Sequence, residues 1–407
     1  MRDLMFLCHR IPHPPDKGDK IRAYHLIEHL RARFRVHLGC FIDDPADAVH
    51  LPALRARVAS LGCFPLDPRR ARLRALWRCR PGMPLLTGYF HDPALASWVD
   101  ATVREQGVSQ IVVFSAAMAQ YADRISGMPK LLDFVDIDSE KFAAYGRTSA
   151  WPKRLVWARE GRTLLAYERA AVRRFDRSLF VSEAERGQFT RLAPESEALT
   201  MAIGNGVDLD YFSPDFAGTS PLPAGRKIIL FTGAMDYRPN SEAVRWFVDE
   251  VMPGLGAFNP LFVIVGSNPG PAVLGLAREG SVMVTGRVAD TRPYLARADL
   301  VVAPLQIGRG VQNKVLEAMA MARPVLATSA AFTGIAAVAG RDLLVADGAA
   351  CWIDQAVSVL AGRHGGMGMA ARMAVEARHS WARALAPLDA VLGVPAPVGT
   401  MEEQVSA

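Results

Sequence analysis

Residues 308–325 read GRGVQNKVLEAMAMARPV, a loop with two glycines followed by a pattern typical of a helix. The apolar run before the loop, Leu300–Pro304, predicts a buried strand, and helical spacing follows over Lys314–Met321. A second apolar run, Pro324–Thr328, comes directly afterwards. Strand, glycine loop, helix and strand in this order predict a βαβ unit, which is a unit of parallel sheets.

The same alternation extends along the chain on both sides of this unit. Short apolar runs, each suited to a strand buried on both faces, occupy Leu4–Cys8, Val36–Ile42, Ile111–Phe114, Lys130–Val135, Ser178–Val181, Lys227–Thr232, Leu261–Val265 and Val282–Thr285. Helical patterns lie between them, including those over residues 21–30, 241–251 and 292–298. The predicted fold class is therefore α/β, with ligands expected at the carboxyl ends of the strands.

A turn-rich stretch divides the chain into two parts. Residues 205–225 are rich in Gly, Ser and Pro and predict a linker. We expect a Rossmann-like domain over residues 1–204 and a second one over 226–380. A helix over 381–394 could cross back to the first domain, and 395–407 form a tail.

Composition restricts the class of protein. Half of the 407 residues are hydrophobic and 22% are charged, which excludes a disordered chain, and no apolar run is long enough to span a bilayer. The five cysteines are scattered, without a CxxC pair for zinc. The first apolar run, Leu4–Cys8, is too short for a secretory signal, so we expect a cytosolic chain with reduced thiols.

Positive charge is concentrated in the first half of the chain. Residues 1–204 carry 31 Lys and Arg against 23 Asp and Glu, whereas residues 205–407 carry 16 against 18. Six arginines fall within Arg69–Arg80, and Leu73, Leu76 and Trp77 share one face of the predicted helix. This pattern suits an anionic membrane surface, and equally a solvated amphipathic helix; it favours nucleic acid less, because no recognition module is present.

The glycine loop suits a phosphorylated ligand. Glycines let backbone N–H groups approach an anion, and the start of a helix adds about half a positive charge. Lys314 could reach the same oxygens, and Glu317, on the same helical face, suits two sugar hydroxyls. The alternative is an ordinary surface ion pair. The stretch is not a Walker loop, because it contains no Gly-Lys-Ser/Thr. It is not the dinucleotide-binding motif GxGxxG either, because Asn313 stands where the third glycine would be.

The string GxGxxxKxxEAMAxxxPV, with Gly206-Val207-Asp208 upstream, resembles the GT-B glycosyltransferases of the large GT4-like group. Residues 9–22, HRIPHPPDKGDKIR, and 309–314, RGVQNK, are similar to the sugar transferases found with exosortase-associated (PEP-CTERM) exopolysaccharide gene clusters. The resemblance covers about residues 4–390.

This resemblance implies two Rossmann-like domains facing across a cleft, the second holding a nucleotide-sugar donor and the first facing the acceptor. Lys314 would neutralise the diphosphate and Glu317 would hold the ribose. It further implies a retaining enzyme without a metal ion or cofactor. Many relatives carry a glutamate where this chain has Arg309, which could pair with phosphate or an acidic sugar instead.

Further donor-binding candidates come from strand ends. They are Gly310, Val311 and Asn313 beside the lysine, Gly233 and Arg238 after Lys227–Thr232, Arg287 after Val282–Thr285, and Gly18 in the N-terminal loop. The alternatives are a tight turn and solvated arginines. Asn240 or Ser241 is expected to cap the next helix.

Three acids follow the strand Lys130–Val135, namely Asp133, Asp136 and Asp138. They could bind a metal ion, although the family resemblance argues against it. Asp136 or Asp138 could instead position an acceptor hydroxyl or act as a general base, or Asp138 could cap a helix. His9 follows the first strand and is a further catalytic candidate.

The sequence thus predicts a glycosyltransferase that moves a sugar from a nucleotide-diphosphate donor to a lipid-linked or saccharide acceptor in exopolysaccharide biosynthesis. We expect it to be cytoplasmic and peripheral to the inner membrane. The alternatives are a nucleotide-sugar 2-epimerase on the same fold and a non-catalytic, membrane-associated nucleotide-binding scaffold.

Overall fold

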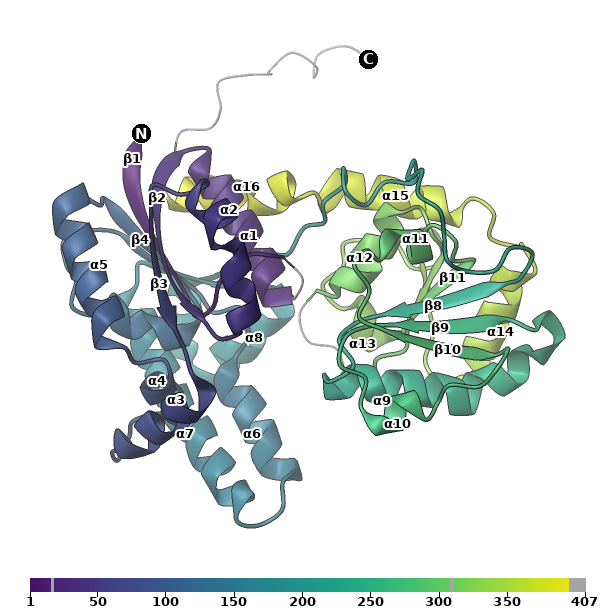
Figure 1. Cartoon of the computed structure of the whole chain (residues 1–407), viewed down its shortest axis with the longest axis horizontal. Helices are drawn as coiled ribbons and strands as arrows, with labels where there is room; N and C mark the ends of the chain where they lie inside the picture. The colour runs from purple at the N-terminus through teal and green to yellow at the C-terminus, as the bar shows by residue number, and fades with distance from the viewer. Residues whose placement is uncertain (16–17, 308–310, 395–407) are drawn as a thin grey trace. The chain divides into compact units, whose positions relative to one another are not determined.

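The computed structural model describes residues 1–15, 18–307 and 311–394, which divide into two compact domains (Figure 1). The first domain comprises residues 1–203 together with residues 385–394, and the second comprises Gly204–Ala384. The boundary at 384/385 falls inside the last helix, α16 (Trp381–Val391). This helix therefore begins in the second domain and ends in the first.

A seven-stranded parallel sheet forms the centre of the first domain, in the order β3-β2-β1-β4-β5-β6-β7. Leu4–Cys8 of the central strand are fully buried, so helices must cover both faces of the sheet. The strands are β1 (Arg2–Cys8), β2 (Phe34–Ile42), β3 (Ser60–Pro65), β4 (Gln110–Phe114), β5 (Lys130–Asp133), β6 (Arg177–Phe180) and β7 (Thr200–Ala202).

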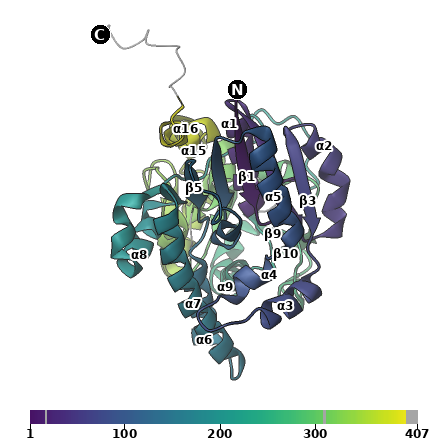
Figure 2. The ribbon, with the colours of Figure 1, turned by 90° about the vertical axis from the view of Figure 1, so that its left-hand side faces the viewer.

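The helices of the first domain include a long hairpin, α6 and α7, which projects beyond the sheet (Figures 1 and 2). They are α1 (Gly18–Arg31), α2 (Leu51–Arg55), α3 (Pro68–Trp77), α4 (Leu85–Tyr89), α5 (Pro93–Gln106), α6 (Asp138–Thr148), α7 (Lys153–Arg174) and α8 (Glu183–Leu192).

The second domain has a six-stranded parallel sheet in the order β10-β9-β8-β11-β12-β13. Its strands are β8 (Ile228–Thr232), β9 (Leu261–Val265), β10 (Val282–Gly286), β11 (Leu300–Ala303), β12 (Val325–Ala327) and β13 (Leu344–Val345). Its helices are α9 (Arg238–Trp246), α10 (Pro271–Leu274), α11 (Arg292–Leu295), α12 (Asn313–Ala320), α13 (Ser329–Phe332), α14 (Ala349–Leu360), α15 (Met367–Arg378) and the start of α16.

Each sheet has one point where the strand order reverses. In the first sheet β2 and β3 lie on one side of β1, and β4 and the later strands lie on the other. In the second sheet the reversal falls between β8 and β11. Loops that leave adjacent strands in opposite directions open a crevice at the carboxyl ends, which is where α/β proteins bind ligands.

The predicted fold class, α/β with two Rossmann-like parallel sheets, is confirmed. Three strands were not predicted: β3, β7 and the two-residue β13. β3 contains Gly62, where a Cβ would lie 2.5 Å from the ring of Trp98, and it ends in Pro65. Glycine and proline in so short a run conceal a strand from apolar periodicity.

Residues 205–225, predicted to be a linker, belong to the second domain. The amide of Val207 donates to the carbonyl of His379 at 2.7 Å, and Arg372 donates to the carbonyls of Leu209 and Phe212. This irregular stretch is thereby fastened to the C-terminal helices. Within the described residues, no helix combines the length and the apolar character needed to span a membrane.

A buried ion pair joins α1 to the end of β5. Arg22 and Asp133 are both fully buried, and Nε and Nη2 of the arginine lie 2.9 and 2.8 Å from Oδ2. Burial raises the pKa of the Asp133 carboxyl, although the Arg22 guanidinium opposes the shift. A pair of this kind is costly to break, because the remaining charge stays in the interior.

Replacing Arg22 with methionine should therefore destabilise the first domain by about 3–5 kcal/mol. Urea unfolding followed by circular dichroism measures the loss. Arg22→Met combined with Asp133→Asn should recover more than half of it, because no buried charge is left over. A single variant as stable as the wild type would show that the pair contributes nothing.

Candidate functional site

Lys314 lies at the strand-order reversal of the second sheet. It is the second residue of α12, which follows the loop after β11, and Gly233 begins the loop after the adjacent strand β8. The sheet thus brings together two predicted site residues that are 81 positions apart in the sequence.

The ammonium of Lys314 reaches over the end of β8. Nζ donates to Oδ1 of Asn240 at 2.6 Å and lies 4.2 Å from the centroid of the Phe231 ring. A Cβ on Gly233 would lie 2.9 Å from Nζ and 2.8 Å from the Asn240 amide nitrogen. Gly233 also has a φ of 153°, so a side chain is excluded on two grounds. The ammonium is therefore enclosed at the strand end.

Asn240 is a site residue that the sequence analysis missed. The prediction that Asn240 or Ser241 caps the helix is wrong, because α9 already begins at Arg238 and Asn240 is buried inside it. Its Nδ2 donates to the carbonyl of Ala234, which leaves Oδ1 to accept from Lys314. Pro239 in the first helical turn is the signal that could have moved the predicted start.

Both charged groups on α12 have shifted pKa values. Burial lowers the pKa of the Lys314 ammonium to about 7, although the charge of Glu317 opposes the shift. Burial likewise raises the pKa of Glu317 to about 7, opposed by the charge of Lys314. Among the described residues, no carboxylate lies within 4 Å of Nζ. An anionic ligand would supply the missing charge, and it would restore the protonated form.

Two predicted donor-binding arginines lie on the surface of the second domain. Arg238 is exposed and forms an ion pair with Glu242 at 2.6 Å, one turn further along α9. Arg287 is exposed just after β10. Gly286 before it has a φ of 70°, and its carbonyl accepts from Gly266. A role of either arginine in donor binding therefore stays a prediction.

The other predicted donor-binding residues before Lys314 are Arg309, Gly310, Val311 and Asn313. Val311 is buried in the hydrophobic core of the second domain. Asn313 begins α12 and accepts a hydrogen bond from Asn205 at 3.2 Å. Arg309 and Gly310 lie outside the described residues.

A cavity of about 820 Å³ lies in the first domain. It contains residues that follow β1, β4 and β5, so it occupies the carboxyl ends of the strands at the reversal of the first sheet. Its lining residues are His9, Arg10, Asp19, Arg72, Ala75, Leu76, Leu85, Leu86, Tyr89, Phe90, Ser115, Phe134, Val135, Asp136, Asp138, Lys141, Phe142, Trp157 and Glu160. His9, Asp136 and Asp138, singled out from sequence, are thus brought to one cavity.

His9 is held by a charged network at the polar end of this cavity. Its Nε2 lies 3.2 Å from Asp19, and Arg10 lies 3.0 Å from the same carboxylate. Burial alone would raise the pKa of Asp19, but the hydrogen bond and charge of His9 and the charge of Arg10 lower it. The His9 ring is parallel to Phe114 at 5.9 Å, and its buried Nδ1 has no hydrogen-bond partner among the described residues. A bound ligand could satisfy this nitrogen.

Two residues with a strained backbone line the same cavity. Ser115 and Val135 follow β4 and β5 with φ values of 79° and 66°. A β-branched valine in the left-handed region is unfavourable, and such strain clusters at functional sites. The amide of Val135 donates to Asp133, so the buried Arg22–Asp133 pair also anchors this turn. Asp136 follows directly, at the cavity wall.

The three acids after β5 do not form one cluster. Asp133 is buried against Arg22, whereas Asp136 and Asp138 line the cavity. Burial raises the pKa of the Asp138 carboxyl, and Lys141 at 3.7 Å opposes the shift. Asp138 is the first residue of α6 and does not cap it. Among the described residues, no group of three His, Cys, Asp or Glu side chains could hold a metal ion.

A large part of the cavity lining is apolar. It is formed by side chains of α3, α4, α6 and α7 and of the residue after α4, namely Ala75, Leu76, Leu85, Leu86, Tyr89, Phe90, Phe142 and Trp157. The sequence analysis identified none of these as cavity residues. A cavity lined by both charged and apolar side chains suits a ligand that has both polar and apolar parts.

The N-terminal loop is only partly described. Gly18 begins α1 on the surface, and no atom lies within 4 Å of where a Cβ would stand. Lys20 is buried and forms an ion pair with Asp47 at 2.6 Å, and Arg22 is the buried partner of Asp133. These two cations therefore stabilise the first domain internally, and the role of Gly18 stays a prediction.

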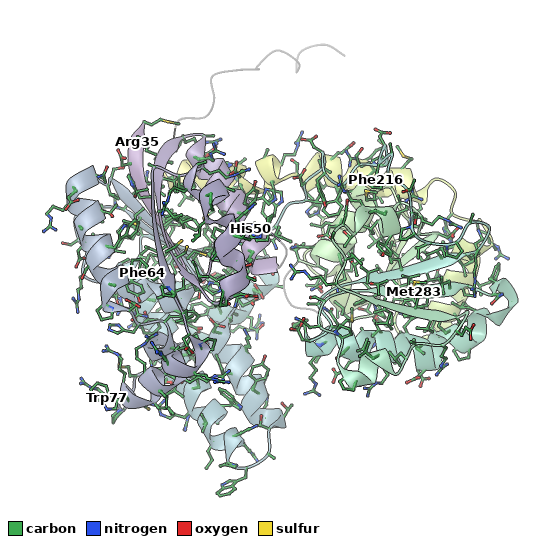
Figure 3. The ribbon with its side chains drawn as sticks, in the orientation of Figure 1. Arg35, His50, Phe64, Trp77, Phe216 and Met283 are labelled. Carbon is green, nitrogen blue, oxygen red and sulfur yellow. The ribbon has the colours of Figure 1, made fainter. Side chains whose placement is uncertain are left out.

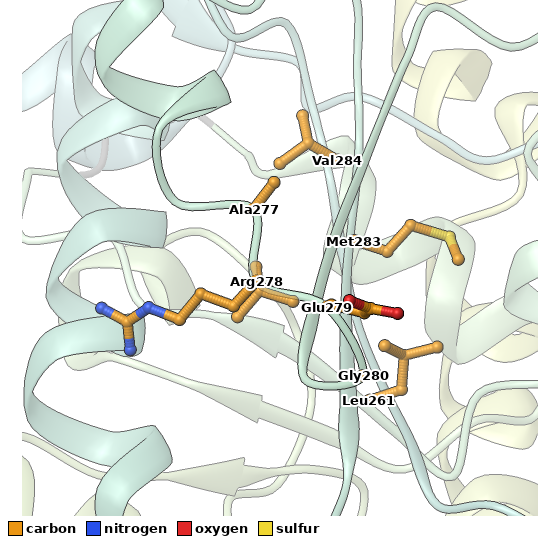
Figure 4. A pocket seen from close by; sticks show the side chains of 8 residues that line it. Leu261, Ala277, Arg278, Glu279, Gly280, Met283 and Val284 are labelled. Carbon is orange, nitrogen blue, oxygen red and sulfur yellow. The ribbon is translucent and has the colours of Figure 1, made fainter.

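A second hollow, of about 370 Å³, lies on the second domain (Figure 4). It is lined by the first residues of β9 and β10 and by the turn Ala277–Gly280, which places it at the amino ends of these strands. Arg278 and Met283 point in opposite directions in Figure 4. The hollow thus lies at the end of the sheet opposite to Lys314, with no convergent polar groups.

The Lys314 amino group should titrate near pH 7. Reductive ¹³C-dimethylation followed by NMR would show its signal moving between pH 6 and 8, and the chain has only seven lysines to resolve. Lys314→Arg assigns the signal. Asn240→Asp should raise the pKa toward the ordinary lysine value of about 10.4, because it places a carboxylate at hydrogen-bond distance. An unshifted lysine in the wild type would contradict the enclosure described above.

Comparisons with known proteins agree with this geometry. Residues 226–362 match the protein family described as glycosyl transferases group 1. No sequence among the curated proteins matches the chain.

Solved structures are similar over nearly the whole chain. Sucrose-phosphate synthase from Thermosynechococcus elongatus has 18% identity and a TM-score of 0.71, covering 97% of this chain and 98% of its own. Anabaena HepE in complex with UDP and glucose has 16% identity and a TM-score of 0.67, covering 97% and 100%. WaaG, a glycosyltransferase involved in lipopolysaccharide biosynthesis, has 14% identity and a TM-score of 0.63, covering 96% and 100%.

At these identities the likeness concerns the fold, and the match over residues 226–362 concerns the family. Residues 226–362 of the second domain are therefore similar to a group 1 glycosyltransferase domain, and the chain as a whole has the GT-B fold.

Proposed function

We propose that the protein transfers a sugar from a nucleotide-diphosphate-sugar donor, held by the second domain, to an acceptor hydroxyl. One observation carries the proposal: the Lys314 ammonium is enclosed beside Gly233 at the start of α12, with no carboxylate of the described residues within 4 Å. This is a site prepared for an anion. The complex of Anabaena HepE with UDP and glucose supports a nucleotide-sugar ligand for this fold.

The chemistry is stabilisation of the leaving group. Negative charge grows on the departing diphosphate, and the Lys314 ammonium together with the positive end of α12 stabilises it. Glu317, one turn along α12, accepts hydrogen bonds from the ribose hydroxyls. Arg309 and Gly310 contribute to phosphate or sugar binding from the same loop. The cations of the chain replace a divalent ion, and the anomeric configuration is retained.

The cavity of the first domain holds the acceptor. Asp136 or His9 positions the reacting hydroxyl or takes its proton, since both line the polar end of the cavity. The apolar wall suits a lipid-linked saccharide, and the charged end suits the sugar itself. We place the reaction in exopolysaccharide biosynthesis, on the strength of the motifs at residues 9–22 and 309–314.

The protein acts at the cytoplasmic face of the inner membrane. Leu73, Leu76 and Trp77 of α3 are all exposed, and arginines surround them. The helix packs on the first domain through Ala71 and Ala75, which leaves its large apolar side chains in solvent. Such a face suits the interface of an anionic bilayer.

The proposal is tested first on the donor. Calorimetry with UDP-, GDP- and ADP-sugars should find one that binds, and Lys314→Ala should weaken it about 10- to 150-fold through loss of a charged hydrogen bond. Lys227→Ala is the matched control, because Lys227 lies just before β8 at the opposite end of the sheet. No binding of any donor, or undiminished binding by Lys314→Ala, would overturn the proposal. Turnover without an acceptor would indicate the 2-epimerase, and binding without turnover the non-catalytic scaffold.

The acceptor side is tested separately. Asp136→Asn and Asp138→Asn should leave donor affinity unchanged, because both residues lie in the first domain. If Asp136 is the base, its variant loses about 10²- to 10⁴-fold in kcat, while Asp138→Asn changes kcat less. Equal and small effects of both variants and of His9→Gln would show that this cavity does not supply the base.

A further inference from the structure

The tip of the α6–α7 hairpin exposes large apolar side chains. Trp151 in the connecting loop is 79% exposed and Leu155 is 62% exposed, and Tyr145 and Val156 are also exposed. Two of these residues belong to α7 and one to α6, so the apolar surface surrounds the turn between the helices. Exposed apolar side chains gathered in this way mark an interaction surface.

The hairpin tip is also strongly basic. Residues 141–159 contain five Lys and Arg and no Asp or Glu, and residues 68–91, from α3 to just after α4, contain six Arg and no acid. The remainder of residues 1–204 carries 20 Lys and Arg against 23 Asp and Glu. The net positive charge of residues 1–204 therefore comes from these two segments.

The two helices of the hairpin pack closely against each other. A Cβ on Gly146 would lie 3.0 Å from the backbone nitrogen of Ala158, and one on Gly161 would lie 2.9 Å from that of Ala143. Glycines at both crossing points bring the two backbones together. The apolar tip is consequently carried by two closely packed helices.

Two neighbouring residues of α7 fasten the hairpin to the α3–α4 segment. Arg159 donates to the carbonyls of Arg80 and Met83 at 2.9 and 3.0 Å. Glu160 accepts from the amides of Leu85 and Leu86 at 2.8 and 2.9 Å. α3 and the hairpin thus form one surface at the same end of the first domain (Figures 1 and 2), where Trp77, 91% exposed, points outward (Figure 3).

We propose that the α6–α7 tip is a second membrane-docking element, which enters the interface of an anionic bilayer together with α3. Tryptophan favours the level of the lipid headgroups, and exposed Arg147, Lys153 and Arg154 supply charge complementary to anionic lipid. A second copy is the poorer partner, because symmetric pairing would bring two strongly positive surfaces together.

This inference deepens the proposed function by committing to a membrane-held acceptor. The helices that carry the docking surface also form the apolar cavity wall, through Leu76 of α3, Phe142 of α6 and Trp157 of α7. An amphiphile in the docked leaflet would therefore meet a cavity lined both by these apolar side chains and by Asp136.

Flotation with phosphatidylcholine vesicles, with and without 30 mol% phosphatidylglycerol, tests docking with no donor present. The full chain should bind the anionic vesicles at least tenfold more tightly. Lys153→Gln/Arg154→Gln should weaken this binding about 30-fold, at roughly 1 kcal/mol per basic residue, and Trp151→Ala/Leu155→Ala by at least about tenfold. Arg245→Gln/Arg363→Gln and Met373→Ala, exposed in the second domain, are the matched controls and should bind like the wild type.

Equal binding of neutral and anionic vesicles, or hairpin variants that bind like the controls, would overturn the inference. Sedimentation velocity showing a dimer that the hairpin variants abolish would overturn it as well. Donor binding by calorimetry is measured on the same variants and should not change. Loss of donor binding in every protein, including the wild type, would instead contradict the proposed function and leave vesicle binding to be judged alone.

Discussion

An ammonium group that lies more than 4 Å from every carboxylate of the described residues is the feature on which the site of the second domain depends. Lys314 is held by the side chain of Asn240, the ring of Phe231 and the bare backbone of Gly233, and its pKa is low because the enclosure disfavours the charge. Each of these contacts lies at the carboxyl end of β8 or in the helix after it. The reversal of strand order between β8 and β11 is what brings the lysine to that point.

The first domain also has a candidate site at the reversal of its strand order, but different side chains line it. Its reversal lies between β1 and β4, and the residues that follow β1, β4 and β5 line a cavity with charged and apolar sides. Here the interior also controls the site, because the fully buried Arg22–Asp133 pair holds the strained turn at Val135. The lining of this cavity is thus supported by a fully buried charge pair.

Much of this was predictable from the sequence, and the failures have physical causes. Strands buried on both faces are uniformly apolar, so β1, β4, β8, β9 and β11 were evident, as was the βαβ unit around Lys314. Asn240 was missed because an asparagine near the start of a helix resembles a cap. Only the structure shows that its side-chain oxygen accepts a hydrogen bond from Lys314. The ion pair of Arg238 with Glu242 was not predicted either, because proximity to a glycine loop does not reveal that Glu242 lies one turn away; the donor-binding role of Arg238 stays a prediction. The apolar cavity wall comes from four helices spread over residues 68–174, which no local pattern could connect.

The course of α16 has a consequence for how the protein can be divided. Leu385 and Leu388 are buried, and Asp389 pairs with His29 at 2.8 Å and with Arg33 at 2.7 Å, all within the first domain. An N-terminal fragment that stops at residue 203 would lack this closing segment and would leave His29 and Arg33 without their partner Asp389. The two halves of this protein are therefore not separable at the obvious sequence boundary, and a self-sufficient first half would need residues 385–394 supplied as a grafted or added peptide.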